Sequence, residues 1–125
     1  MSGGEAVRTS LTLREVARLL EASFLTGEIG ASSRIAVVCG MDLMSDVLSF
    51  GKRAQLLLTS LINAQAVRTA ELSDIPAICF VHGKRPSDDA VELARSSGVA
   101  LLVTRFSMFA ACGKLAAAGL VGGDA

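Results

Sequence analysis

The sequence predicts an α/β fold with three layers, in which helices cover both faces of a mainly parallel sheet of about four to five strands. Short apolar runs alternate along the chain with segments of helical spacing, which is typical of parallel sheets. The runs are continuous rather than alternating, as expected for strands buried on both faces. The clearest unit spans residues 55–86, where two apolar runs flank one helix and predict a right-handed βαβ crossover.

The first expected helix begins at Thr12. Thr12 with Glu15 three residues later is a capping-box pattern, in which the two side chains satisfy free backbone N–H groups. Apolar residues follow at helical spacing and predict that this helix ends near Ala22. An extended segment over 24–26 then predicts a short strand or arm.

The first clear buried strand is expected over 34–39, where an apolar run ends at Gly40. A short helix is expected over 41–48, with Asp42 or Ser45 as its N-cap. This pair of elements starts a regular alternation of strand and helix.

The later elements continue that alternation. Strands are expected over 56–58, 77–81 and 99–103, and helices from 63, over 88–97 and over 108–118. Ser87 is a good N-cap, while Gly98 and Gly119 are natural stops after a helix. The whole chain therefore reads as one helix followed by four strand–helix units.

The length of the chain fits a single domain. Its 125 residues predict one α/β domain over 11–120, with a flexible lead-in over 1–10 and a disordered tail over 121–125. Hydrophobic residues make up 51%, enough for a core, while Lys+Arg and Asp+Glu are both 12. This charge balance and the absence of Trp and Tyr argue against nucleic acid as a partner.

The cysteines and the missing targeting signals bear on location. Cys39, Cys79 and Cys112 are widely spaced, which predicts buried free thiols, as in a reducing cytoplasm. The sequence shows no signal peptide and no membrane span of about 18 apolar residues, so we expect a soluble, cytoplasmic protein without a membrane partner. One histidine with scattered cysteines makes no zinc site, and we expect no metal and no cofactor.

Ligands of open parallel sheets bind beyond the carboxyl ends of the strands. Four loops lie there in the predicted fold, and their side chains suit a phosphate or nucleotide near helix N-termini. Ordinary caps and turns use the same residue types, so a structural role stays open for each position. The candidate ligand-binding residues are Asp42, Thr59, Ser60, Asn63, His82, Gly83, Lys84, Thr104, Arg105 and Ser107.

No catalytic constellation is legible in the sequence, so we assign no catalytic residue and predict that the protein is not an enzyme. Ser60 lacks the Gly-x-Ser-x-Gly pattern, and no P-loop motif occurs. Arg68 and Thr69 on the central helix, with Asp46 on the preceding one, either face solvent or contact a second subunit. These three residues are candidates for a subunit interface, because dimerisation is one way to cover the edge strands of a small sheet.

Several segments, taken in order, resemble the DRTGG domain. They are Ser45–Leu48, Leu57–Thr59, Val67–Glu71, Asp74–Ile75, Gly83–Pro86 and Thr104–Gly113. The resemblance covers residues 13–120, and the name-giving residues are best assigned to Arg68, Thr69 and Gly83. Gln55 stands where some relatives carry an Asp, so no role that requires an acid is carried over to that position.

The resemblance implies a compact α/β domain similar to the N-terminal domain of HPr kinase, here in a standalone form. It also implies a non-catalytic, regulatory and dimerising module, which occurs in phosphotransacetylases and in pyrophosphatases with CBS domains. We therefore expect a homodimer that senses a small phosphorylated ligand or regulates a protein partner. Two alternatives stay open: a small enzyme acting on a phosphorylated metabolite, with Asp42 and His82 as acid or base, and a purely structural dimerisation domain.

Overall fold

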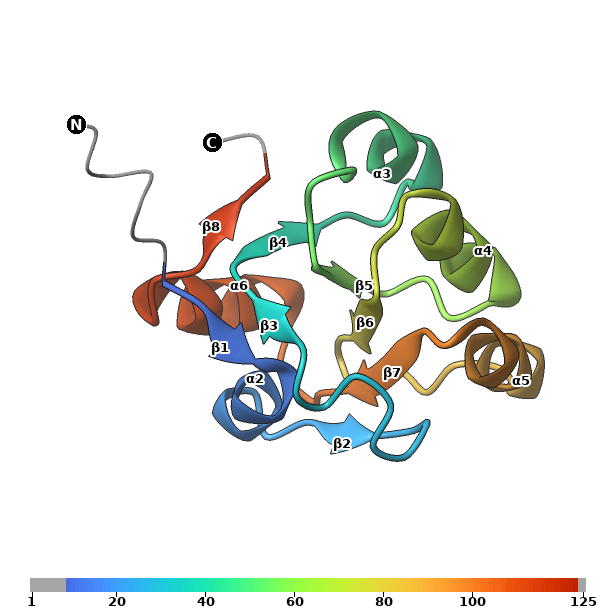
Figure 1. Cartoon of the computed structure of the whole chain (residues 1–125), viewed down its shortest axis with the longest axis horizontal. Helices are drawn as coiled ribbons and strands as arrows, with labels where there is room; N and C mark the ends of the chain where they lie inside the picture. The colour runs from blue at the N-terminus through green and yellow to red at the C-terminus, as the bar shows by residue number, and fades with distance from the viewer. Residues whose placement is uncertain (1–8, 124–125) are drawn as a thin grey trace.

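The computed structural model describes residues 9–123 and has three layers (Figure 1). Its centre is a six-stranded sheet in the order β2-β7-β6-β5-β4-β8. The strands are β2 (Ser23–Phe24), β4 (Val37–Gly40), β5 (Leu56–Thr59), β6 (Ala77–Phe80), β7 (Ala100–Val103) and β8 (Val121–Gly122). Only β2 runs antiparallel to its neighbour, β7. The expected α/β fold with a mainly parallel sheet is confirmed.

Five helices in the described part of the chain cover the two faces of this sheet. They are α2 (Leu13–Leu19), α3 (Met44–Phe50), α4 (Ala64–Leu72), α5 (Asp88–Ser97) and α6 (Met108–Ala117). Successive strand residues point to opposite faces, so each strand feeds two cores. Leu57 and Ile78 pack in the core under α3, α4 and α5, whereas Leu56 and Cys79 pack in the core under α2 and α6.

The strand expected over 34–39 is divided into two. A separate two-stranded antiparallel sheet contains β1 (Leu11–Thr12) and β3 (Arg34–Ile35), while β4 belongs to the main sheet. At the break, Oε1 of Gln55 accepts hydrogen bonds from the N–H groups of Ala36 (2.9 Å) and Val37 (2.8 Å). The prediction of one continuous strand is therefore wrong, because a distant side chain satisfies the backbone where the strand changes sheets.

Three helix ends follow the local sequence signals. Thr12 and Glu15 form the expected capping box at the start of α2. Ser87 caps α5 by accepting the N–H of Ala90 at 3.3 Å. Gly98 ends α5 in the left-handed conformation, with φ 77. These predictions are confirmed because capping depends on residues within a few positions of one another.

The helix α2 ends at Leu19, earlier than the expected Ala22. Glu21 takes a left-handed φ of 52, and the N–H of Ala22 donates to the carbonyl of Ala17 at 2.8 Å. This is a Schellman-type ending with glutamate at the position where glycine is usual. The sequence gives no stop signal there, and the side chain of Glu21 pairs with Arg105, in the loop after β7.

The helix α3 begins later than expected. Its N-cap is Leu43, which makes no side-chain capping bond, and Ser45 lies inside the helix. Asp42, the other expected cap, instead bonds to the loop after β5. Neither predicted cap therefore serves α3.

The end of the described chain adds an edge strand. Val121–Gly122, expected to lie in a disordered tail, forms β8, and the N–H of Val121 donates to the carbonyl of Ala36 at 3.1 Å. In register, Val121 lies opposite Val37 and Gly122 opposite Val38. Residues 1–8 and 124–125, which include most of the expected lead-in and the end of the tail, lie outside the described residues.

Candidate ligand site at the carboxyl edge of the sheet

Three of the candidate residues meet where β4 and β5 end. Oδ1 of Asp42 accepts hydrogen bonds from the hydroxyl of Thr59 (3.1 Å) and from the backbone N–H of Ser60 (2.7 Å). The pKa of Asp42 is lowered, chiefly by the hydrogen bond from the N–H of Ser60. Partial burial raises this pKa, but the hydroxyls of Ser60 and Thr59 and the charge of Lys84 lower it further. The ionised carboxylate of Asp42 is therefore the anion that the N–H of Ser60 binds in this loop.

The loop after β6 is a tight turn over residues 81–84. His82 and Gly83 both have positive φ, 61 and 66, and a backbone bond of 3.1 Å closes the turn, as in type I′ turns. The N–H of His82 donates to the carbonyl of Phe106, and that of Gly83 to the carbonyl of Thr104, both at 2.8 Å. Backbone bonds therefore tie this loop to the loop after β7, while the imidazole of His82 is exposed.

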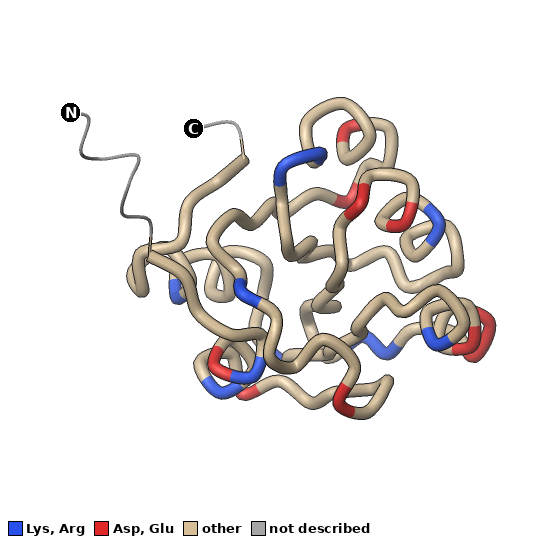
Figure 2. Tube along the Cα trace, viewed as in Figure 1, with Lys and Arg blue, Asp and Glu red and all other residues tan. Residues whose placement is uncertain are grey.

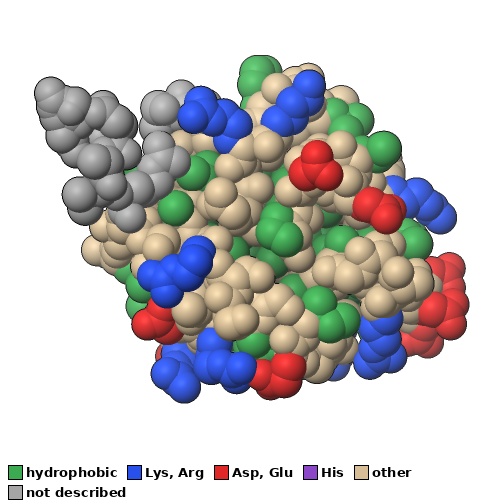
Figure 3. Space-filling view, viewed as in Figure 1, with side chains coloured by type: hydrophobic (Ala, Val, Ile, Leu, Met, Phe, Trp, Pro, Cys, Tyr) green, Lys and Arg blue, Asp and Glu red, His purple; other side chains and the backbone are tan. Residues whose placement is uncertain are grey.

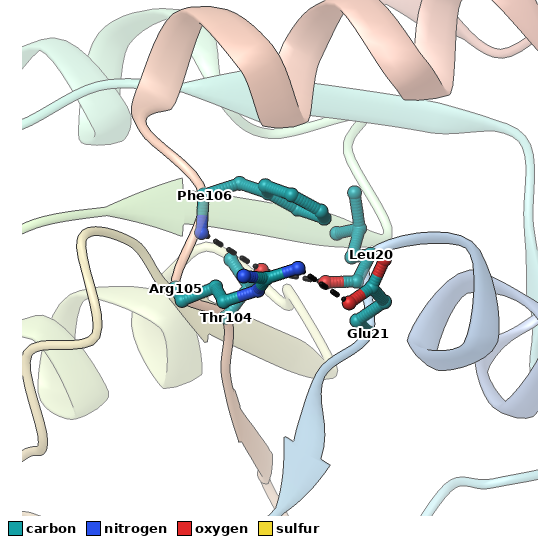
Figure 4. A network of polar contacts seen from close by, with 5 residues as sticks. All are labelled: Leu20, Glu21, Thr104, Arg105 and Phe106. Atoms are coloured by element: carbon teal, nitrogen blue, oxygen red, sulfur yellow. Dashed lines mark hydrogen bonds and ion pairs between the residues drawn. The ribbon is translucent and has the colours of Figure 1, made fainter.

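The loop after β7 is fastened in turn to the end of α2 (Figure 4). The hydroxyl of Thr104, which is buried, donates to the carbonyl of Leu20 at 2.6 Å and accepts the N–H of Phe106 at 3.2 Å. The guanidinium of Arg105 pairs with Glu21 at 2.8 Å and lies 5.2 Å from the centre of the Phe106 ring. The unusual φ of Glu21 thus occurs where its carboxylate meets Arg105.

Two further candidates act as helix caps. The side chain of Asn63 accepts the N–H of Gln65 at 3.1 Å, at the start of α4. The hydroxyl of Ser107 accepts the N–H of Ala110 at 3.1 Å, at the start of α6. Both oxygens satisfy backbone N–H groups of their own helix.

The interface candidates differ in exposure. Asp46 on α3 and Arg68 on α4 are exposed, whereas Thr69 is only 5% exposed and packs within the domain. Asp46 and Arg68 are not paired with each other among the ion pairs of the described residues. A subunit contact through these helices would therefore rest on Asp46 and Arg68.

The candidates form two groups along one edge of the sheet. The first contains Asp42, Thr59 and Ser60, with Lys84 near enough to lower the pKa of Asp42. The second group consists of the candidates in the loops after β6 and β7, which backbone hydrogen bonds hold together. The loops after β4, β5 and β6 lead to helices on one face, while the loop after β7 leads to α6 on the other. The topological switch point therefore lies between β6 and β7, where open sheets commonly bind ligands.

Charges of both signs are spread around the periphery rather than gathered on one side (Figure 2). On the face seen in Figure 3, apolar side chains appear as scattered spots among tan backbone and polar groups. Within residues 9–123, no cluster of three or more His, Cys, Asp or Glu side chains would hold a metal ion. No helix in this part of the chain is long and apolar enough to cross a membrane.

Two hollows adjoin the loops after β6 and β4. One, of about 590 Å³, adjoins α5 and includes Arg85, Asp88, Glu92 and Arg95. The other, of about 320 Å³, lies at the β4–β8 edge between α3 and α6; we call it the edge pocket. Its lining includes Gly40, Met41, Phe50, Cys112, Ala116 and Gly122.

The edge pocket contains residues that sequence reasoning did not select. Cys112, expected to be buried, is half-buried and lines the pocket. Cys39 and Cys79 are buried as predicted, and Cys39 also lines the pocket. The rule that ligands bind at strand ends pointed to the loop after β4, beginning at Gly40. It gave no sign of Phe50 or Cys112, because their approach depends on how α3 and α6 pack against the edge.

The strand order and the two helical layers define a three-layer α/β domain with a mainly parallel sheet. Among solved structures, the chain is similar to the crystal structure of the CBS and DRTGG domains of the regulatory region of Clostridium perfringens pyrophosphatase, complexed with its activator, diadenosine tetraphosphate. The TM-score is 0.61 at 17% identity, over 87% of this chain and 47% of that chain. The resemblance to the DRTGG domain is thus confirmed at the level of the fold.

Comparisons by sequence add no closer relationship. The chain matches no family model and no curated protein. It also spans only 47% of the solved chain that it resembles, so that chain's other regions have no counterpart in the alignment.

Proposed function

We propose that this protein is a non-catalytic regulatory module that binds a nucleotide or another phosphorylated small molecule and works as a homodimer. The fold carries the proposal, since the similar pyrophosphatase region is regulatory and was solved with a nucleotide activator. The free cysteines fit the reducing cytoplasm that we propose as its location.

The carboxyl edge of the sheet is the proposed binding region. Lys84 and Arg105 are exposed cations there, and the N–H of Ser60 already binds an anion, the carboxylate of Asp42. A phosphate at this edge would compete with Asp42 for Ser60 and with Glu21 for Arg105. Binding would therefore replace hydrogen bonds and an ion pair within the protein by contacts with the ligand. This exchange would let ligand binding change the conformation of the loops.

Two alternatives have weaker support. An enzyme would need an acid or base, but the carboxylate of Asp42 is occupied by Ser60 and Thr59, and His82 belongs to another loop. A purely structural dimerisation domain is favoured by exposed apolar side chains, above all Phe109 and Leu72, which are 88% and 77% exposed. Such side chains are common at subunit contacts.

The proposal is tested by a thermal-shift screen of nucleotides and phosphorylated metabolites, on protein whose mass in solution has been measured. A ligand at about 100 times its dissociation constant stabilises the native state by about 2.7 kcal/mol and raises the melting temperature by several degrees. We expect such a shift, and a solution mass of twice the chain mass of 12.9 kDa.

Charge-removing variants locate the site. We expect Lys84→Ala or Arg105→Ala to reduce the shift, and Arg53→Ala to leave it unchanged. Arg53 is also exposed but lies in the turn before β5, at the opposite edge of the sheet. A dimer that no compound stabilises would contradict ligand sensing and leave the structural alternative standing.

A further inference from the structure

The edge pocket exists because β8 is shorter than its neighbour. β8 ends at Gly122, opposite Val38, while β4 continues to Gly40. Within the described part of the chain, no strand therefore lies beside the last residues of β4. We call this open side of β4 the lane. The pocket occupies this lane.

The backbone of Gly40 faces the open lane. The N–H of Met41 donates to the carbonyl of Leu58 at 3.0 Å, and the carbonyl of Val37 accepts from Gln55, so the odd-numbered residues of this stretch bond toward β5. The carbonyl of Ala36, by contrast, bonds to β8. By this alternation the N–H and C=O of Gly40 both point toward the β8 side, where β8 has already ended.

Two helices form the walls of the pocket. A Cβ atom at Gly40 would lie 2.9 Å from Sδ of Met108 and 3.0 Å from Sγ of Cys112, so side chains of α6 lie directly over this backbone. Ala116 continues the wall on α6, and Phe50, which is 59% exposed, stands at the end of α3. The pocket thus combines apolar walls with one backbone donor and one backbone acceptor side by side.

The shape of the lane selects the kind of occupant. Added strands normally pair over several residues, and here Gly122 and Gly123 close one end of the lane, leaving the Gly40 backbone pair. A flat heteroaromatic ring can be held by a single backbone N–H and C=O pair, because purine bases carry a hydrogen-bond donor next to an acceptor. The volume of about 320 Å³ lies at the lower end of the range for small-molecule sites.

We infer that the edge pocket binds the purine base of a nucleoside or nucleotide, with the base paired to the N–H and C=O of Gly40. The inference rests on the proposed function and names the part of the ligand that this pocket takes. Met41 lines the pocket, and the carboxylate of the next residue, Asp42, accepts the N–H of Ser60 in the loop after β5. The base site therefore adjoins the loops proposed for the phosphates.

Calorimetric titration of the full chain with adenosine, guanosine, AMP, GMP and inorganic phosphate tests the assignment. We expect at least one purine nucleoside to bind, and Ala116→Phe, which fills the pocket, to weaken binding at least about tenfold. The matched control is Ala117→Phe, the next residue of the same helix, which is also exposed but does not line the pocket. It should bind within about twofold of the original protein.

The thiol of Cys112 gives a second readout on the unmodified protein. It is half-buried in the pocket, while Cys79 is buried away from the pocket and serves as the internal control; Cys39 also lines the pocket but is buried. Burial raises the pKa of Cys112, so alkylation by iodoacetamide is followed at about pH 9. A saturating purine nucleoside should slow modification of Cys112 at least about tenfold and leave Cys79 unreacted.

The outcomes separate this inference from the broader proposal. Nucleotides that bind equally well to Ala116→Phe, and lose affinity only in Lys84→Ala, would overturn the base site and keep the sensor. An apolar peptide that protects Cys112 when no nucleoside does would overturn it in favour of strand addition. Failure of every purine to bind or to protect Cys112 would also overturn it, whatever the result with phosphate.

Discussion

At the carboxyl edge of the sheet, the β4–β5 pair and the β6–β7 pair are linked by different kinds of hydrogen bond. The loops after β4 and β5 are joined by one titratable side chain, Asp42, at the surface. The loops after β6 and β7 are joined by backbone bonds and continue, through the buried hydroxyl of Thr104, to α2. The first link can be released by a proton or a competing cation or anion, whereas the second is part of the packed domain. The difference indicates that the loops after β4 and β5, rather than those after β6 and β7, can rearrange when a ligand binds.

The largest expected effect is on the buried link. Thr104→Val keeps the shape of the side chain but leaves the carbonyl of Leu20 and the N–H of Phe106 without their partner. We expect the free energy of unfolding to fall by about 3 kcal/mol, since unpaired buried groups cost roughly 1–3 kcal/mol each. Urea denaturation measures the change.

A smaller loss of stability is expected for Thr59→Val at the end of β5. Thr59 is also buried, but its hydroxyl donates to exposed Asp42, which keeps its bond to Ser60, and accepts only the N–H of Leu61. We expect a loss of about 1 kcal/mol. Equal losses in Thr59→Val and Thr104→Val would show that the two links do not differ as described.

An effect of about the same size, but dependent on pH, is expected at the surface link. Asp42→Asn keeps the acceptor oxygen but removes the charge, and we expect it to cost about 1 kcal/mol at neutral pH, because solvent screens an exposed carboxylate. The folded protein lowers the pKa of Asp42 below its ordinary value of 3.8. The contribution of the charge is therefore complete above that value and is lost as the pH falls through the lower, folded-state pKa.

Urea denaturation of both proteins over a pH series checks this sign. The stability difference between them should be constant at neutral pH and shrink toward zero in acid. A difference that does not change with pH would mean that the bond geometry of Asp42, and not its charge, holds the loops together.

The smallest effect is expected at the Glu21–Arg105 ion pair. The two side chains are 57% and 73% exposed, so the pair should contribute about 0.5 kcal/mol and weaken with added salt. A double-mutant cycle of Glu21→Gln and Arg105→Met, measured by urea denaturation at low and high salt, isolates the coupling. A salt-independent coupling of about 2 kcal/mol or more would place this pair with the buried link.

The candidate site was predictable in part. The rule that ligands bind at strand ends selected the loops containing Asp42, Ser60, His82 and Thr104, and the structure does place these loops along one edge. It did not indicate that Asp42 would occupy the N–H of Ser60, 18 residues further along the chain. Nor did it indicate Glu21, whose link to Arg105 joins residues 84 positions apart. Such pairings depend on strand order, which no local pattern specifies.

The sequence by itself determined the alternation of buried strands and helices, the capping box at Thr12 and the glycine stop at Gly98, because each depends on residues within one turn or one apolar run. The tertiary structure decided the rest. It split the strand expected over 34–39 through the side chain of Gln55 and placed β8 beside β4, leaving the edge pocket at Gly40. The physical reason is that backbone and side-chain partners at strand edges come from distant parts of the chain, and packing of the two helical layers selects them.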